Sequence, residues 1–200
     1  MCIAAWVWEA HPLYRLLLVF NRDELHDSLW MVGDGGRKIL GGRDGLAGGT
    51  WLGCTRNGRI AFLTNVRETC SLPVPKSRGD IPVKFLEGEM SPMEFAEEVV
   101  EQGDLYNGFN LVLADLRSKS MVFATNRGPV AIELVSPGLH VLSNGSLDSP
   151  WPNQQRQLPD TGYGSDVEFE VSSIFVDAEL DMVKSWKQMQ VEYQIEESEK

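Results

Sequence analysis

Apolar residues along this chain occur in short runs separated by turn-forming residues. Residues 3–8 and 16–20 form the first two runs, and residues 10–12, which include a proline, lie between them. This pattern predicts two antiparallel strands joined by a turn. Neighbouring antiparallel strands lie about 4.7–4.9 Å apart. Arg22 and Asp23, which follow the second run, are therefore expected within side-chain reach of the start of the chain.

A second hairpin is predicted in the middle of the chain. Residues 50–55 and 60–66 are apolar runs on either side of Asn57-Gly58, a dipeptide that favours tight hairpin turns because both residues accept positive φ. The glycine-rich residues 41–49 lack the Gly-Lys-Ser/Thr ending of a phosphate-binding loop and precede a strand. We interpret them as a tight connection at the site entrance.

Helix signals appear only after these strands. Asp80 is expected to cap a short helix that ends near residue 86. Ser91, followed three residues later by Glu94, forms a capping box, and the apolar positions after it recur at helical spacing until Gly103. This stripe is typical of a helix face that packs on a core.

The rest of the chain again favours strands. An antiparallel meander is predicted by apolar runs at residues 109–114, 121–125, 130–135 and 139–143. Residues 172–176 predict a further strand, and residues 178–193 show partial helical periodicity, so we expect a frayed helix or disorder there. Together these elements predict an α+β fold. We expect one domain over residues 1–177 and a divergent acidic tail over residues 178–200.

Composition narrows the functional classes. The 200-residue chain carries a net charge of −11 and has a sequence pI near 4.7. Such a charge disfavours nucleic acid and anionic membranes as ligands. Residues 16–20 are too few to span a bilayer. The three cysteines form no disulfide framework, and no Cys-x-x-Cys or His-x-x-x-His pair is present. We expect a cytoplasmic protein with no metal, no cofactor and no transmembrane segment.

Cys2 is the strongest chemical candidate in the sequence. If the initiator Met1 is removed, one residue carries both a thiol and a free α-amino group. A thiolate is the nucleophilic form of cysteine, and an α-amine with a pKa of about 7.7–8.0 is a base at neutral pH. This is the arrangement of N-terminal nucleophiles. The alternative is a chance cysteine followed by a solvated, charged turn.

Seven segments resemble one known family. They are MCIAAWVWEAHPLYRLLLVFNRDE, ILGGRDGLAGGTWLG, GRIAFLTNVRE, SRGDIPVKFL, SPMEFAEEV, YNGFNLVLADL and SPGLHVLSNGSLDSPWPN, and they cover about the first 155 residues. The chain resembles the NRDE family, the transport and Golgi organization protein 2 homologues.

The resemblance implies a fold and a set of site residues. It implies an αββα sandwich of the N-terminal nucleophile hydrolase type, most similar to the cysteine branch that cleaves linear amides. In that branch Cys2 corresponds to the nucleophile and Arg22 and Asp23 to its charged partners. Asn65 and Asn144 correspond to the asparagines of the oxyanion site, although asparagine also ends strands for purely structural reasons.

The resemblance weakens after Trp151. The longer helical insertion and the Gly-Thr-Arg-Ser segment of the relatives have no counterpart here, so we expect a sandwich that is incomplete at its C-terminal end. Three functions stay open. The first is intracellular trafficking with lipid or haem handling, as the resemblance implies. The second is an N-terminal-cysteine hydrolase of a linear amide or related acyl bond, and the third is an inactive truncated isoform.

The expected partners follow from these alternatives. They are a small acyl or amide substrate, or a haem or lipid ligand. We expect association with the Golgi, as the name of the family suggests, or with mitochondria, in either case through other proteins.

Overall fold

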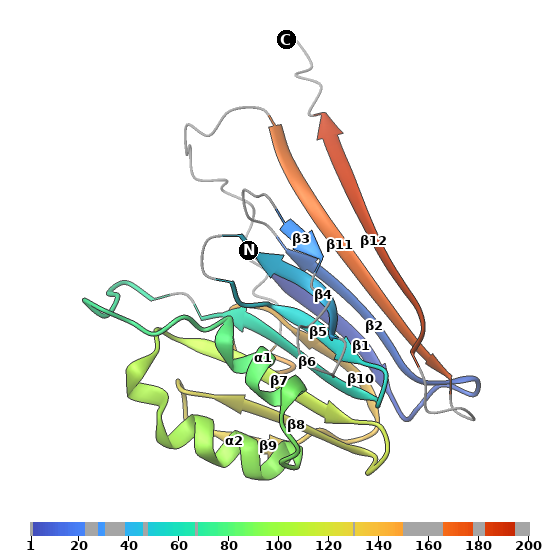
Figure 1. Ribbon diagram of the computed structural model, residues 1–200, viewed down its shortest axis with the longest axis horizontal. Coiled ribbons are helices and arrows are strands. Elements are labelled where there is room, and N and C mark those ends of the chain that lie inside the picture. The colour runs from blue at the N-terminus through green and yellow to red at the C-terminus, as the bar shows by residue number, and fades with distance from the viewer. Residues whose placement is uncertain are drawn as a thin grey trace.

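The computed structural model describes residues 2–22, 28–30, 39–45, 48–66, 68–129, 131–149, 166–177 and 183–194, of which residues 22, 28–30, 166–177 and 183–194 are described as backbone only. The strands form two antiparallel sheets (Figure 1). One sheet has five strands in the order β10-β1-β2-β11-β12, and the other has seven in the order β3-β4-β5-β6-β7-β8-β9. The mixed α+β class predicted from the sequence is confirmed.

The five-stranded sheet is built around the predicted first hairpin, which is confirmed. Its strands are β10 (Gly138–Leu142), β1 (Ile3–Trp8), β2 (Tyr14–Arg22), β11 (Asp166–Asp177) and β12 (Val183–Gln194). On β1 every second residue is buried, and the buried Trp6 pairs with the buried Leu18 of β2. This alternation is typical of a sheet with one face on the core.

Two sequence predictions for this sheet are wrong. The fourth run of the expected meander, β10, leaves its neighbours and pairs with β1, with Ala4 opposite Leu142. Of residues 178–193, where a helix was expected, residues 178–182 lie outside the described residues, and the rest belong to the strand β12, which pairs with β11. Residues 188–193 alternate polar and apolar side chains in sequence, and this period of two prevailed over the weaker helical spacing.

The seven-stranded sheet contains the second predicted hairpin. Its strands are β3 (Ser28–Trp30), β4 (Ile39–Asp44), β5 (Leu52–Thr55), β6 (Arg59–Asn65), β7 (Phe109–Asp115), β8 (Ser120–Thr125) and β9 (Ile132–Leu134). Between β5 and β6 only Gly58 adopts a positive φ, of 84°, and its N–H donates to Thr55 O at 3.1 Å. The turn is therefore a three-residue loop with a left-handed glycine rather than a two-residue turn with positive φ at Asn57.

Half of the glycine-rich segment is a strand, which corrects the expected loop. Gly41 and Gly42 belong to β4 and are buried. A Cβ atom at Gly42 would lie 2.5 Å from the indole of Trp51. Glycine is therefore required at this position by close packing against Trp51, and not by a bound phosphate.

The main core lies between the two sheets. Trp6 packs edge-on against Phe62, with ring centroids 5.1 Å apart, and Phe20 packs against the same ring at 6.1 Å. Both tryptophans of β1 and the facing side chains of β6 and β7 belong to this cluster. Burial of this aromatic surface fixes β1, and hence Cys2 just before it, against the seven-stranded sheet.

Two helices cover the outer face of the seven-stranded sheet (Figure 1). They are α1 (Asp80–Glu87) and α2 (Pro92–Glu101), and the short 3-10 turn η1 (Gly103–Leu105) follows α2. The predicted capping box at Ser91 is present in full. The expected cap at Asp80 is wrong, because Gly79 holds the cap position and no side chain caps α1.

The layers in the described residues are therefore helices, seven-stranded sheet and five-stranded sheet. No helix in these residues covers the outer face of the five-stranded sheet. Neither helix is long and apolar enough to cross a membrane.

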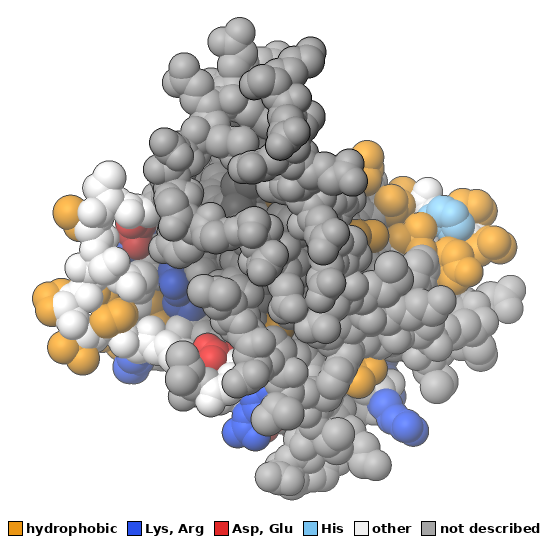
Figure 2. All heavy atoms as spheres, turned by 90° about the horizontal axis from the view of Figure 1, so that it is seen from above, with side chains coloured by type: hydrophobic (Ala, Val, Ile, Leu, Met, Phe, Trp, Pro, Cys, Tyr) orange, Lys and Arg blue, Asp and Glu red, His pale blue; other side chains and the backbone are white. Residues whose placement is uncertain are grey.

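The turn between β1 and β2 forms an exposed apolar tip. His11 Nδ1 accepts hydrogen bonds from the N–H groups of Leu13 and Tyr14, both at 3.2 Å, and the Leu13 side chain is exposed. Figure 2 shows hydrophobic side chains gathered around a histidine at one side of the molecule. This tip lies at the opposite end of β1 from Cys2, so it plays no part in the candidate site.

Candidate functional site

Strand pairing places Cys2 between two of the predicted site residues. The β1–β2 ladder ends at Ile3 and Asn21 and the β1–β10 ladder at Ala4 and Leu142, so Cys2 lies just beyond the paired residues, with Arg22 following Asn21 on one side and Asn144 following β10 on the other. Ser143 Oγ donates a hydrogen bond to Cys2 O at 3.1 Å, which fixes the backbone at this point. The half-buried Cys2 is thus tied to the residues that follow β10.

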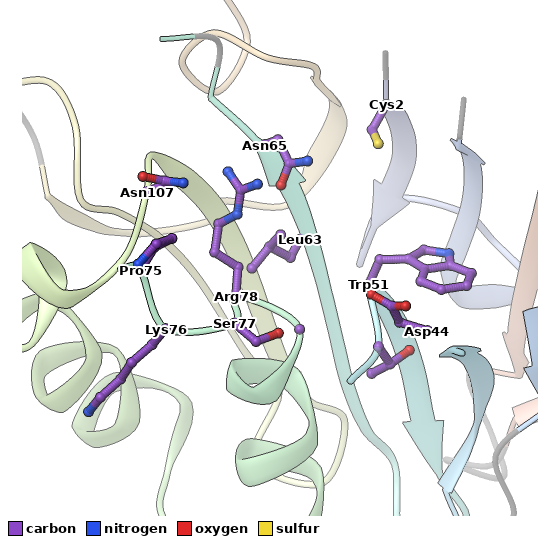
Figure 3. A pocket seen from close by; sticks show the side chains of 12 residues that line it. Cys2, Asp44, Trp51, Leu63, Asn65, Pro75, Lys76, Ser77, Arg78 and Asn107 are labelled. Carbon is purple, nitrogen blue, oxygen red and sulfur yellow. The ribbon is translucent and has the colours of Figure 1, made fainter. Parts of the chain in front are cut away.

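Cys2 opens onto a pocket of about 350 Å³ between the sheets and the loop that precedes α1. The pocket is lined by Cys2, Asp44, Thr50, Trp51, Leu63, Asn65, Pro75, Lys76, Ser77, Arg78, Gly79 and Asn107. Figure 3 shows the Cys2 sulfur directed into this space, with Trp51 below it and Asn65 across from it. A thiol and an amide that could donate a hydrogen bond therefore share one cavity.

Asn65 and Asn144 meet at the ends of β6 and β10. The Asn144 Nδ2 atom donates a hydrogen bond to Asn65 O, so one amide N–H of Asn144 braces the end of β6. The Asn65 side chain lines the pocket, whereas Asn144 is not among the lining residues. The geometry thus gives the two asparagines different positions, with Asn65 facing the cavity and Asn144 behind it.

A buried amide that sequence analysis missed supports this junction. Asn110, on β7, is almost fully buried, and its Nδ2 atom donates to Gly145 O at 2.5 Å and to Ser143 O at 3.3 Å. Thr64 Oγ1 also donates to Ser143 O, at 2.7 Å. These bonds tie the residues after β10 to the seven-stranded sheet. The sequence signal was present, because Asn110 is a polar residue inside an apolar strand.

The loop before α1 forms the opposite wall of the pocket. Arg78 Nη1 donates to Gly108 O at 2.8 Å, and the Gly108 N–H donates to the carboxylate of Glu68 at 2.5 Å. Glu68 also pairs with Arg127 at 2.6 Å. The hydrogen bond from Gly108, the pairing with Arg127 and the charge of Arg78 lower the pKa of Glu68. Sequence analysis did not single out Arg78, so its place in the pocket was missed.

Two of the predicted charged partners are described less fully. Arg22 is described as backbone only, at the end of β2, and Asp23 lies outside the described residues. The structure therefore brings Cys2, Asn65 and Asn144 together, and it leaves the roles of Arg22 and Asp23 as predictions.

The other two cysteines occupy contrasting environments. Cys54 is buried in the core between the sheets, and this burial raises the pKa of its thiol to about 12. Cys70 is exposed on the loop after β6. Because the thiolate is the reactive form, Cys54 is expected to be inert at neutral pH.

The pocket is lined by both polar and apolar side chains. No three His, Cys, Asp or Glu side chains come together in the described ranges as a metal would require. The pocket combines a thiol, amide donors and a guanidinium with the apolar side chains of Trp51 and Leu63. This arrangement can accommodate a carbonyl group near Cys2 and an apolar segment beside it.

Comparisons with known proteins agree over most of the chain. A family model described as Transport and Golgi organisation 2 matches residues 1–160. The Transport and Golgi organization 2 homolog of Mus musculus is 35% identical over 164 residues, which cover 76% of this chain and 59% of the mouse protein. The Homo sapiens homolog is 34% identical with the same coverage. The chain thus spans less than two thirds of these relatives.

The chain is also similar, at low identity, to solved structures, of which one is described here. It is a Caenorhabditis elegans N-acylethanolamine-hydrolyzing acid amidase ortholog, with a TM-score of 0.47 and 13% sequence identity. The similarity covers 72% of this chain and 70% of that chain.

Proposed function

This chain belongs to the Transport and Golgi organisation 2 family, and we propose that it acts through the pocket beside Cys2, by nucleophilic attack on a linear amide or related acyl bond. The observation that carries this proposal is the shared cavity of the Cys2 thiol and the Asn65 amide. The proposal requires that Met1 is removed, because only then does Cys2 possess a free α-amine.

The proposed reaction uses both groups of Cys2. The α-amine takes the proton of the thiol, and the sulfur attacks the carbonyl carbon to form a carbon–sulfur bond. The carbonyl electron pair moves to oxygen, where the Asn65 amide donates a hydrogen bond. Collapse of this intermediate expels the amine, which takes the proton from the α-ammonium. Water then hydrolyses the resulting thioester and releases the acid.

The remaining predicted residues support these steps in the proposal. The Arg22 guanidinium favours the thiolate of Cys2, and the Asp23 carboxylate holds the ammonium of its α-amine. Asn144 contributes by bracing the end of β6, which fixes the direction of Asn65. One donor to an oxyanion is worth about 2.7–4 kcal/mol in comparable sites.

The second candidate function is ligand carriage in intracellular trafficking. The names of the relatives refer to transport and Golgi organization. Trp51, Leu63 and Pro75 give the pocket an apolar side that could hold a lipid chain or a haem without chemistry. In this alternative Cys2 is a lining residue only, and the ligand is delivered at the Golgi or another organelle through partner proteins.

Intact-mass analysis with an acylating thiol probe distinguishes the candidates. At neutral pH we expect rapid acylation of Cys2, slower labelling of the exposed Cys70 and none of the buried Cys54. Asn65→Ala is expected to slow Cys2 acylation by about 10²–10³-fold, because it removes an oxyanion donor. Asn57→Ala, at an exposed asparagine of the β5–β6 turn, is the matched control.

Three results would contradict the hydrolase proposal. They are retention of Met1, acetylation of the Cys2 nitrogen, and equal labelling rates for Cys2 and Cys70. Saturable binding of a lipid or haem that is unchanged by Cys2→Ala would then favour carriage. Absence of both labelling and binding would favour an inactive isoform.

A further inference from the structure

His140, on β10, is a buried titratable side chain that the proposed reaction does not use. Its ring packs against Trp6 of β1, with ring centroids 5.5 Å apart. The Nδ1 atom lies 2.7 Å from Asp148 Oδ2, and the Nε2 atom lies 2.8 Å from Ser136 O. Each ring nitrogen therefore faces an oxygen at hydrogen-bonding distance.

This arrangement is complete only when the ring carries two protons. Both oxygens are acceptors when Asp148 is ionised, and only the imidazolium form of histidine has two N–H donors. Loss of either proton leaves a nitrogen lone pair against an oxygen. Among the described residues Asp148 is the one charged side chain in contact with His140, because β1 presents the uncharged Trp6 and the residues before β10 present the carbonyl of Ser136.

Asp148 closes residues 143–147 back onto β10. Its Oδ1 atom accepts the N–H of Val141 at 2.8 Å, and its own N–H donates to Val141 O at 3.0 Å. We call these two bonds and the bond to His140 the Asp148 clasp. Asp148 has a φ of 51°, a left-handed conformation that is uncommon outside glycine and persists only where surrounding contacts hold it. Loss of the bond to His140 therefore favours release of this backbone.

The closed segment contacts the candidate site directly. Ser143 Oγ donates to Cys2 O at 3.1 Å, and Asn144 Nδ2 donates to Asn65 O. Closure of a loop restricts the conformations of the residues within it. The Asp148 clasp thus limits the movement of the two side chains that hold the Cys2 backbone and the end of β6.

We propose that His140 and Asp148 are positioning residues, and that a proton on His140 closes the Asp148 clasp, so that the geometry of Cys2 and Asn65 in the pocket depends on pH. As the pH rises and the ring loses a proton, one ring hydrogen bond is lost and residues 143–147 are less confined. The consequence for the reaction rests on the proposed function. The clasp itself can be measured without turnover.

NMR and amide hydrogen exchange on the full chain test the clasp. Ring nitrogen chemical shifts report how many protons His140 carries, and its signals are identified by their loss in His140→Gln. Histidines usually titrate between about pH 5 and 8. Over this range we expect the protection factors of the Val141 and Asp148 amides to fall about tenfold or more as the ring loses its proton, because a hydrogen bond to a charged group is lost.

Asp148→Asn gives the sharpest comparison because it preserves the shape. Its amide oxygen can accept the N–H of Val141, and its amino group can donate to Nδ1 of a neutral ring whose Nε2–H donates to Ser136 O. The clasp then closes without the second proton, so we expect protection that does not fall as the pH rises. Asp104→Asn, at an exposed aspartate of η1, is the matched control and should keep the wild-type pH dependence. Unfolding curves report whether each variant folds.

Two measurements link the clasp to the candidate site. The chemical shifts of the Asn144 side-chain amide, which bonds to Asn65 O, should follow the ring titration in the wild type and stay constant in Asp148→Asn. The rate of Cys2 acylation in the wild type is divided by the rate in Asp148→Asn at each pH, which removes the pH dependence that both chains share. We expect this ratio to fall several-fold as the pH rises, because misplacement by about 1 Å can cost on the order of 10²-fold in rate.

The outcomes separate this inference from the proposed function. Protection factors that do not follow the ring titration, or a fall that survives in folded Asp148→Asn, overturn the clasp. Asn144 shifts that do not follow the ring, or a constant ratio of acylation rates, overturn its positioning role. Absence of Cys2 acylation at every pH, with Asn144 shifts that follow the ring, rejects the reaction at Cys2 and supports the clasp.

Discussion

Asn110 offers the sharpest test of how the candidate site is held together. Its Nδ2 atom makes one short hydrogen bond, to Gly145 O at 2.5 Å, and longer contacts to Ser143 O and Thr64 Oγ1 at 3.3 and 3.4 Å. The longer contacts exceed the usual range and add little. We therefore count one strong bond from a buried donor.

The expected loss follows from this count. Asn110→Ala removes the bond, but Gly145 is exposed, so water can replace the donor at its carbonyl. We expect a loss of about 1–2 kcal/mol in the free energy of unfolding. At roughly 2–4 °C per kcal/mol for a chain of this size, Tm falls by about 2–8 °C.

Asn110→Asp is a stricter variant because it changes the chemistry while it preserves the shape. It places a carboxylate against two carbonyl oxygens and a hydroxyl oxygen, and we expect a loss of about 3 kcal/mol or more. Protonation converts the introduced carboxylate into a donor, so this loss is expected to shrink as the pH falls.

Urea unfolding followed by tryptophan fluorescence measures these changes, since Trp6, Trp8 and Trp51 are buried. Asn57→Ala is the control and should change the free energy of unfolding by less than about 0.5 kcal/mol. If Asn110→Asp is as stable as Asn110→Ala, or if both match the control, the buried amide does not hold the residues after β10.

Two further predictions concern the described part of the chain. Glu68→Gln is expected to remove the stability that comes from the lowered pKa of Glu68. The free energy of unfolding of the wild-type chain should exceed that of the variant most at pH values above about 4.3, the usual pKa of glutamate. This difference should disappear as the pH falls through the lowered pKa of Glu68 in the folded chain. Urea titrations over a pH series test this, and a difference that does not depend on pH would contradict it. Ser91→Ala removes the N-cap of α2 and should cost about 1 kcal/mol, with faster amide hydrogen exchange confined to the first turn of α2; unchanged exchange there would show that the cap contributes nothing.

The features that sequence analysis predicted well depend on neighbouring residues. The capping box at Ser91 and the left-handed Gly58 between β5 and β6 are determined by a few adjacent side chains. The first hairpin likewise follows from apolar alternation and a turn. Such signals can be read directly from a short stretch of sequence.

The features that were missed depend on distant parts of the chain. Turn residues before β10 do not indicate which sheet it joins, and its pairing with β1 depends on the aromatic core between the sheets. Arg78 likewise resembles any arginine of a polar loop in sequence. It becomes a pocket residue because Gly108, 30 positions away, accepts its hydrogen bond. Tertiary contacts therefore determine both the sheet that β10 joins and the place of Arg78 in the pocket.

The pairing of β1 with β10 has a consequence for biosynthesis. A nascent chain that contains only the first hairpin exposes a strand edge of β1 that has no neighbour. The reason is that Leu142 of β10, which pairs with Ala4 of β1, is translated long after it. Contacts of such long sequence separation form slowly and leave nascent chains prone to aggregation. The end of the five-stranded sheet that carries Cys2 therefore matures late, and general chaperones are expected to shield the nascent hairpin until β10 has left the exit tunnel.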